Sequence, residues 1–358
     1  MGKILVKCSF LFLLAGFLGA CSANDPEMPT EPTVPDGLPI GFGALSHMAT
    51  DDSRVADGAA ATDGFVDDAK FKQEGKFLVY SNYDYNLVNG KYTESVPEFQ
   101  KQLVEYKILS TSEAKWTYEP KRYWSGTGAY HFRACFPVDA DIVPSSNGKN
   151  LAVNYSIYKN NYDLMVAFHK RDMATYQGNK TEKVNLEFNH ALAAVRLKLL
   201  AGKGKQFTLK RISIKDLYTV GVFSYICDIN SDDARTNWPE VLFSNWLPSY
   251  LDPSENIYGF TGSAPITDSD ATTFKSKFLF AIPQELDPSR ERPTKLMFTI
   301  EVDGQEVSTV KTLPAKRWLP GRKYTYLIHV EPGGDTEIEV VATDWEKVDA
   351  AGDDIIIE

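Results

Sequence analysis

From about residue 77 onward, apolar and polar residues alternate along the chain. Every second side chain is apolar over residues 193–200, 295–302 and 323–330. A two-residue period with one apolar face is typical of antiparallel strands that bury one side. Hairpin-type turn signals interrupt such runs at Asn89-Gly90, Asn147-Gly148 and Asp303-Gly304. The pattern predicts an all-β fold of short strands packed as sandwiches, with residues 98–109 as the best short helix candidate.

A break in this pattern suggests where the folded part divides. The polar stretch 172–183 separates two groups of strand-like runs, and a new run begins at Val184. Two β-sandwich domains, residues 38–185 and 186–358, would each have a common domain size. The sequence therefore predicts two domains in tandem.

The first 20 residues have the layout of a secretory signal peptide. Lys3 and Lys7 precede an apolar core at residues 9–18, which is too short to span a membrane. The ending at residues 18–21 resembles the lipobox of bacterial lipoproteins, whose cysteine is acylated on sulfur, as by palmitate, and becomes the mature N-terminus. Cys21 is therefore the expected lipidation site. An ordinary signal peptide with an unmodified Cys21 is the alternative.

Residues 21–37 are rich in Pro and acidic side chains and poor in apolar ones. Such a composition predicts a flexible spacer between the lipid and the folded body. Two or three acyl chains hold a protein firmly on a bilayer, whereas one does not. No later segment has about 18 uninterrupted apolar residues, so lipid is the expected membrane attachment.

Composition and motifs argue against several classes of function. A net charge of −10 disfavours a nucleic-acid partner, which requires a concentrated basic surface. The five histidines are scattered without metal-ligand spacing, and the chain has no phosphate-binding loop and no nucleophile elbow. We therefore expect no enzyme activity, no catalytic residues, no metal and no cofactor.

Two smaller features leave alternatives open. The segment from Asp228 to Asp233 resembles the start of a calcium loop, but Asp233 replaces the required Gly and Pro239 replaces the bidentate acid. A solvated acidic loop is the preferred interpretation over calcium binding. Cys135 and Cys227 each lie in an apolar run. Two separate buried thiols are preferred over a disulfide, because sequence does not show their distance.

Aromatic residues gather in two places. One group is Trp116, Tyr118, Tyr123, Trp124 and Tyr130, and the other is Trp238, Trp246 and Tyr250. Exposed rings would stack on sugars, but Trp and Tyr also fill sandwich cores. Core packing is the preferred interpretation. Glycan binding is the alternative.

Several segments occur in an order that resembles the fimbrillin-like family of bacterial lipoproteins, the subunits of type V pili. They are residues 18–21, 116–124, 132–137, 188–193, 281–284 and 318–326, and Trp345. The resemblance implies two tandem transthyretin-like β-sandwich domains after the signal peptide and spacer. It also implies a surface-exposed, lipid-anchored protein of the outer membrane or the fimbrium. Its expected partners are other pilin subunits, with a host or bacterial surface receptor as a further possibility.

The resemblance further implies assembly by strand exchange. In that family a protease cuts after an arginine beyond the first strand, and a neighbouring subunit's strand fills the opened groove by β-augmentation. Here the removable strand would be residues 38–45, and the cut would fall between Arg54 and Val55. An uncut loop at Arg54 is the alternative. The donor-strand candidates are residues 336–342 and the terminal Ile355, Ile356 and Ile357.

These observations lead to one leading hypothesis and one alternative. The leading hypothesis is a structural subunit of a surface fimbria, or a fimbria-associated adhesion lipoprotein, with a stalk, tip or anchor role left open. The alternative is a monomeric outer-membrane lipoprotein that binds glycan.

Overall fold

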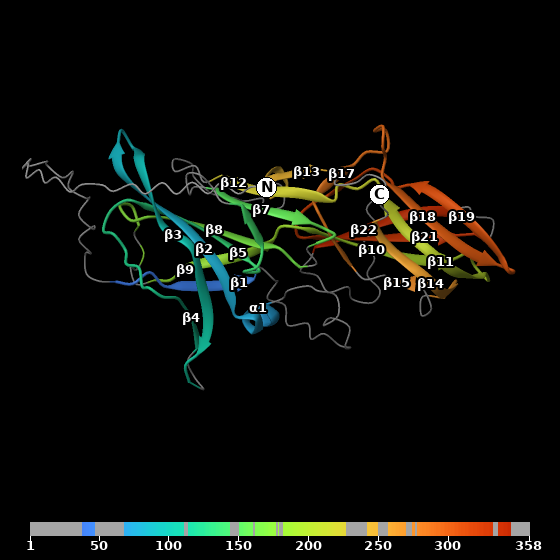
Figure 1. Cartoon of the computed structure of the whole chain (residues 1–358), viewed down its shortest axis with the longest axis horizontal. Helices are drawn as coiled ribbons and strands as arrows, with labels where there is room; N and C mark the ends of the chain where they lie inside the picture. Colours follow the sequence, from blue (N-terminus) through green and yellow to red (C-terminus); the bar gives the residue numbers. More distant parts are fainter. Residues whose placement is uncertain are drawn as a thin grey trace, which may run out of the picture.

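The computed structural model describes residues 38–46, 68–110, 114–143, 150–159, 162–176, 178, 182–226, 242–249, 257–269, 274–275, 278–331 and 336–344. These residues form 22 strands, the seven-residue helix α1 (Asp68–Glu74) and a short helical stretch at residues 242–244. The predicted all-β class is therefore confirmed. Within the described residues, no helix has the length and apolar character needed to cross a bilayer. The molecule is elongated, with the N-terminal strands toward one end and the C-terminal strands toward the other (Figure 1).

The N-terminal end is built on a seven-stranded sheet with the order β1-β9-β8-β5-β2-β3-β4. All its pairs are antiparallel except β1 with β9. The inner face of this sheet encloses an aromatic core. Its strands are β1 (Phe42–Ser46), β2 (Lys76–Val88), β3 (Lys91–Ile108), β4 (Ala114–Thr117), β5 (Ala129–Phe136), β8 (Met165–Asp172) and β9 (Val184–His190).

The helix expected at residues 98–109 is wrong, because this segment belongs to β3. Phe99 and Val104 both face the aromatic core although they are five residues apart, a spacing that a regular strand does not give. A register shift in the pairing with β2 near Lys101, whose φ is +52°, makes this possible. The five-residue spacing of Phe99 and Val104, which suggested a helix, therefore comes from a bulge in a strand.

A second sheet covers the opposite face of β2, β5 and β8, with the order β13-β12-β7-β6. Its strands are β6 (Asp141–Val143), β7 (Asn150–Ser156), β12 (Val220–Ile226) and β13 (Trp246–Ser249). β12 pairs with β7 along seven residues, although the strands β8, β9, β10 and β11 lie between them in sequence. The boundary expected between residues 185 and 186 falls inside β9. The division into two consecutive domains remains a prediction.

The C-terminal end contains two sheets that face each other across a separate core. One has the order β15-β10-β21-β22, with β16 also paired to β10, and the other has the order β14-β11-β18-β19. The three segments of cleanest alternation are β10, β18 and β21, which confirms them as strands. The bounds are β10 (Ala193–Ala201), β11 (Gln206–Lys215), β14 (Ile257–Thr267), β15 (Phe274–Lys275), β16 (Leu279–Ala281), β18 (Lys295–Val302), β19 (Gln305–Thr312), β21 (Arg322–Val330) and β22 (Thr336–Asp344). A small pair, β17 (Gln284–Leu286) and β20 (Lys316–Trp318), completes the described strands.

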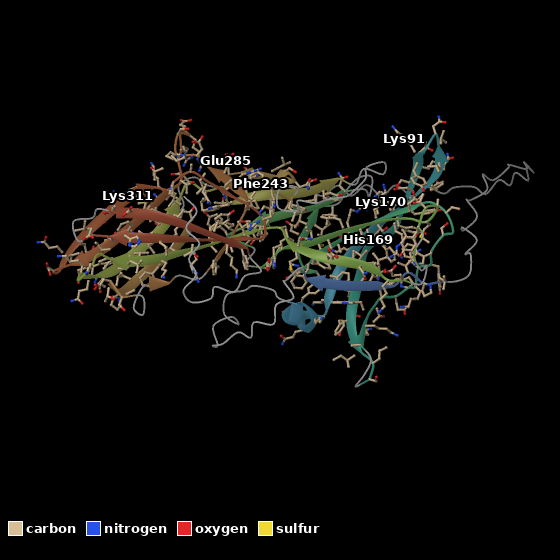
Figure 2. The ribbon with its side chains drawn as sticks, turned by 180° about the vertical axis from the view of Figure 1, so that it is seen from behind. Lys91, His169, Lys170, Phe243, Glu285 and Lys311 are labelled. Carbon is tan, nitrogen blue, oxygen red and sulfur yellow. The ribbon has the colours of Figure 1, made fainter. Side chains whose placement is uncertain are left out.

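The two ends of the molecule are marked by lysines in Figure 2. Lys91 lies at the end of the long β2–β3 hairpin, and Lys311 lies on β19 toward the opposite end. β1 lies at the same end as Lys91, in the N-terminal part of the molecule.

Candidate strand-acceptor groove

The segment of residues 38–46, which contains β1 and the residues just before it, is held between two stretches of backbone. On one side it runs parallel to β9, from Phe42 beside Val184 to Ser46 beside Phe188. On the other side the amide of Ile40 donates to the carbonyl of Arg122 (2.8 Å), and the amide of Trp124 donates to the carbonyl of Leu38 (3.1 Å). We call β9 and residues 122–124 the two rails of the groove.

Alternate side chains from Ile40 to Ala44 point into the aromatic core. Ile40 and Phe42 are each 1% exposed, and Ala44 is 4% exposed. The Phe42 ring contacts four others, with centroid distances of 6.5, 5.6, 5.4 and 5.8 Å to Phe77, Phe99, Tyr118 and Phe132. Edge-to-face ring pairs of this kind contribute about 0.5–1.5 kcal/mol each beyond the burial of area. β1 therefore completes the N-terminal core.

The buried hydroxyl of Tyr118 adds a polar anchor to β1. It donates to the carbonyl oxygen of Ile40 (2.8 Å) and accepts from the amide of Arg122 (3.2 Å). Burial raises the pKa of Tyr118 to about 12, so the hydroxyl keeps its proton at neutral pH. One side chain thus links β1 to one of its rails.

Arg171 on β8 links the two rails to each other. Its guanidinium lies 4.7 Å from the ring of Trp124 and 4.6 Å from the ring of Tyr176. It also donates to the carbonyls of Glu182 (2.9 Å) and Lys183 (3.0 Å), which immediately precede β9. Arg171 is 4% exposed, and burial lowers its pKa. We call Arg171 with Trp124 and Tyr176 the Arg171 clasp.

The helix α1 closes the core on the side where β1 ends. Phe71 of α1 is fully buried, and its ring lies 4.8 Å from that of Phe188 and 5.4 Å from that of Trp116. The helix lies downstream of Arg54 in the sequence. A cut after Arg54 would therefore leave α1 attached to the body while β1 is separated from it.

A cleft of about 220 Å³, open to solvent on one side, lies beside β1. Trp116 of β4 and Leu186 of β9 form part of its lining together with Ala44, so the cleft lies where β1 faces the edge of β4. Polar side chains, among them Lys115 and Asn185, line the rest.

Most of the sites expected from sequence lie outside the described residues. These are Cys21, Arg54, Val55, Ile355, Ile356, Ile357, Cys227 and the acidic segment 228–233. Cys135 is a free, fully buried thiol, and burial raises its pKa to about 12. The donor-strand candidate at residues 336–342 lies in β22, which already pairs with β21 of the same chain.

The aromatic groups noted in the sequence are mainly core residues. Tyr118, Trp124, Tyr130 and Trp246 are all at most 5% exposed, and the indole of Trp246 donates to the carbonyl of Ala191 (2.8 Å). Tyr123, at 42%, is exposed, while Trp238 and Tyr250 lie outside the described residues. The buried rings are closed to sugar stacking, which removes most of the support for the glycan alternative.

Sequence reasoning missed the Arg171 clasp entirely. Arg171 stands near the polar stretch interpreted as a domain junction, and nothing in its neighbourhood signals an aromatic partner. Tyr118 was noted only as one of several aromatics. Their roles depend on long-range pairing that places residues 38–40, 118–124 and 182–184 together.

No curated protein matches the chain. Among solved structures, a Bacteroides uniformis protein assigned to cell adhesion has a TM-score of 0.47 at 16% identity, covering 86% of this chain and 98% of its own. A fimbrial assembly protein of Parabacteroides distasonis has a TM-score of 0.32 at 12% identity, with coverages of 76% and 88%. The tip fimbrial protein Mfa3 of Porphyromonas gingivalis has a TM-score of 0.36 at 12% identity, with coverages of 75% and 94%.

The sequence profile of the fimbrillin-like family matches residues 66–345. The match begins just before α1 and ends just after β22, so it contains nearly all of the described fold. Since it spans well over half of the 358 residues, the chain belongs to the fimbrillin-like family.

Proposed function

We propose that this chain is a structural subunit of a bacterial fimbria that assembles by strand exchange after proteolysis between Arg54 and Val55. The supporting observation is the position of β1. It is a short strand with buried side chains, and it joins the body only through the segment that contains Arg54. Its partners are other pilin subunits, and the subunit reaches the outer membrane as a lipoprotein acylated at Cys21.

Burial explains why a cut is needed. Ile40 and Phe42 are nearly inaccessible, and each fully buried large side chain contributes about 1.5–3 kcal/mol. While the chain is intact, β1 also stays near its groove at a high effective concentration, because the connecting segment tethers it. Proteolysis removes the tether, so that a strand from another subunit competes with β1 on equal terms.

The removal of β1 would leave a groove suited to β-augmentation. The backbone of β9 would lose its parallel partner, and the rings around Phe42 would be exposed to water. An incoming strand would restore both the main-chain hydrogen bonds and the apolar contacts. The terminal Ile355, Ile356 and Ile357 are the proposed donor residues, because an apolar end of this kind is an aggregation hazard unless a partner covers it.

The test compares wild type with Arg54→Ala after treatment with an arginine-specific protease, and particle size is followed by light scattering. We expect wild type to form polymers and Arg54→Ala to stay monomeric. Arg211→Ala is the matched control, because Arg211 is exposed on β11 in the C-terminal sheet. Arg211→Ala should polymerise as wild type does. Polymerisation of Arg54→Ala at the wild-type rate would reject the proposed gate.

A further inference from the structure

An open cleft of about 440 Å³ lies between β13 and β17, away from β1 (Figure 1). Its surface comes from segments far apart in sequence, with Tyr218 before β12, Phe243 before β13 and Glu285 on β17. Figure 2 labels Phe243 and Glu285 next to each other. Small-molecule sites typically have volumes of about 300–1,000 Å³, so the cleft is large enough to hold a ligand.

Two aromatic rings form an apolar part of the cleft. Tyr218 and Phe243 are half-buried, and neither belongs to the aromatic groups noted in the sequence. Cζ of Arg317 lies 4.0 Å from the centroid of the Phe243 ring, and Cζ of Arg290 lies 5.6 Å from that of the Tyr218 ring. Cation–π contacts of this kind hold a ring in position. The cleft therefore presents flat apolar surfaces at fixed places.

A buried amide fixes the main chain that carries Tyr218. Gln284 is 1% exposed, and its Oε1 accepts from the amide of Tyr218 (3.0 Å). Its Nε2 donates to the carbonyls of Tyr218 (3.3 Å) and Ile282 (3.0 Å). Because Gln284 directly precedes Glu285, the same residue joins one ring to the neighbouring carboxylate. The cleft is thus largely formed in advance, which lowers the cost of ordering it around a ligand.

Two exposed carboxylates, Glu285 and Asp287, complete the accessible lining. Oδ1 of Asp287 accepts from the amide (2.8 Å) and the hydroxyl (2.6 Å) of Ser289. These hydrogen bonds lower the pKa of Asp287, so the group is ionised at neutral pH. An ionised carboxylate only accepts hydrogen bonds, so the cleft is suited to a ligand that donates them.

The cations at the cleft are already engaged by the protein. Arg290 donates to the carbonyl of Asp216 (2.6 Å) and to the hydroxyl of Thr294 (2.7 Å), while Arg317 lies against Phe243. The carboxylates therefore disfavour an anionic ligand. The guanidinium groups beside the rings disfavour a cationic one, because like charges repel. A neutral ligand with hydroxyl donors and an apolar face remains.

We infer that this cleft binds a neutral sugar unit of a glycan. A pyranose ring has an apolar face of C–H groups and a rim of hydroxyl groups. The apolar face lies against the rings of Phe243 and Tyr218, and the hydroxyls donate to Glu285 and Asp287. Such a site gives the subunit a means of attachment to glycan-coated surfaces, which its assembly into a fimbria does not by itself provide.

The experiment uses the intact, uncut chain, so its outcome is independent of strand exchange. Binding is measured on an array of immobilised oligosaccharides that end in neutral hexoses, N-acetylhexosamines or fucose, together with their sialylated forms. We expect binding to a neutral glycan. Absence of binding to every neutral glycan, or binding to sialylated forms alone, would overturn the inference.

Variants then locate the binding site. Glu285→Gln should weaken binding to that glycan about tenfold, because it removes a charged acceptor. Phe243→Leu should weaken it about fivefold, since leucine is apolar but lacks a flat face, whereas Phe243→Tyr should bind as wild type does. If Phe243→Leu does not fold, Glu285→Gln decides the question, because Glu285 is exposed.

Two exposed residues outside the cleft provide matched controls. Glu306→Gln on β19 and Tyr123→Leu in the N-terminal part should both bind the glycan as wild type does. Unchanged binding by Glu285→Gln would place the glycan elsewhere and overturn the inference.

Discussion

The guanidinium of Arg171 lies 4.7 Å from the ring of Trp124, and this contact joins two parts of the chain that hold β1 between them. The backbone amide of Trp124 donates to Leu38 on one side of β1. Through the carbonyls of Glu182 and Lys183, the same guanidinium fixes the start of β9 on the other side. The groove is therefore kept at its width by a residue that does not itself pair with β1.

Replacing Arg171 by lysine should loosen both rails. Lysine keeps the charge but lacks the planar fork that donates to two carbonyls while stacking on rings. We expect the unfolding free energy to fall by about 1–2 kcal/mol. Hydrogen exchange at the amides of Ile40 and Trp124 should become faster, and mass spectrometry of exchanged peptides measures this.

Arg196→Lys is the matched control for the clasp. The guanidinium of Arg196 lies 4.5 Å from the ring of Phe278, and Arg196 belongs to β10 in the C-terminal end. This substitution should leave exchange at Ile40 and Trp124 unchanged. If Arg171→Lys also leaves it unchanged, the clasp does not hold the groove.

Acid should lower the stability of the N-terminal sheet through His169 on β8. Figure 2 labels His169 beside Lys170. Burial and, to a smaller extent, the neighbouring Arg171 together lower the pKa of His169 from 6.5 to about 4, while Glu182 opposes the shift. The unfolded chain thus binds a proton first as the pH falls. The stability contributed by neutral His169 is complete above pH 6.5 and is lost as the pH falls to about 4.

Thermal unfolding of His169→Gln across this pH range tests the effect. The melting temperature of the variant should fall less steeply with acid than that of wild type. His329→Gln, on β21 in the C-terminal sheet, serves as the control and should follow the wild-type curve. Parallel curves for wild type and His169→Gln would contradict the prediction.

Lipidation is tested by metabolic labelling with a fatty acid. Cys21→Ala should carry no label and should leave the membrane fraction, because the spacer alone has no affinity for lipid. Cys135→Ala should be labelled as wild type is, since Cys135 is a buried thiol in β5. Equal labelling of Cys21→Ala and wild type would refute the assignment of Cys21.

The sequence by itself determined the class of the fold. A two-residue period records which side of a strand is buried, and this information is local, so β10, β18 and β21 could be found directly. The inward positions Ile40 and Phe42 of the removable strand are also visible as an alternating pattern. Where a bulge changes the spacing, as near Lys101, the same local signal indicated a helix that does not form.

Only the tertiary structure decided which strands pair and what surrounds β1. Pairing depends on hydrogen bonds between edges far apart in sequence, such as β7 with β12, and no local pattern records the partner. The cation–π contacts of Arg171 and the ring contacts of Phe42 arise from the same long-range packing. The sequence thus indicated a short apolar strand at residues 38–45, whereas the packing determined which backbone and which rings surround it.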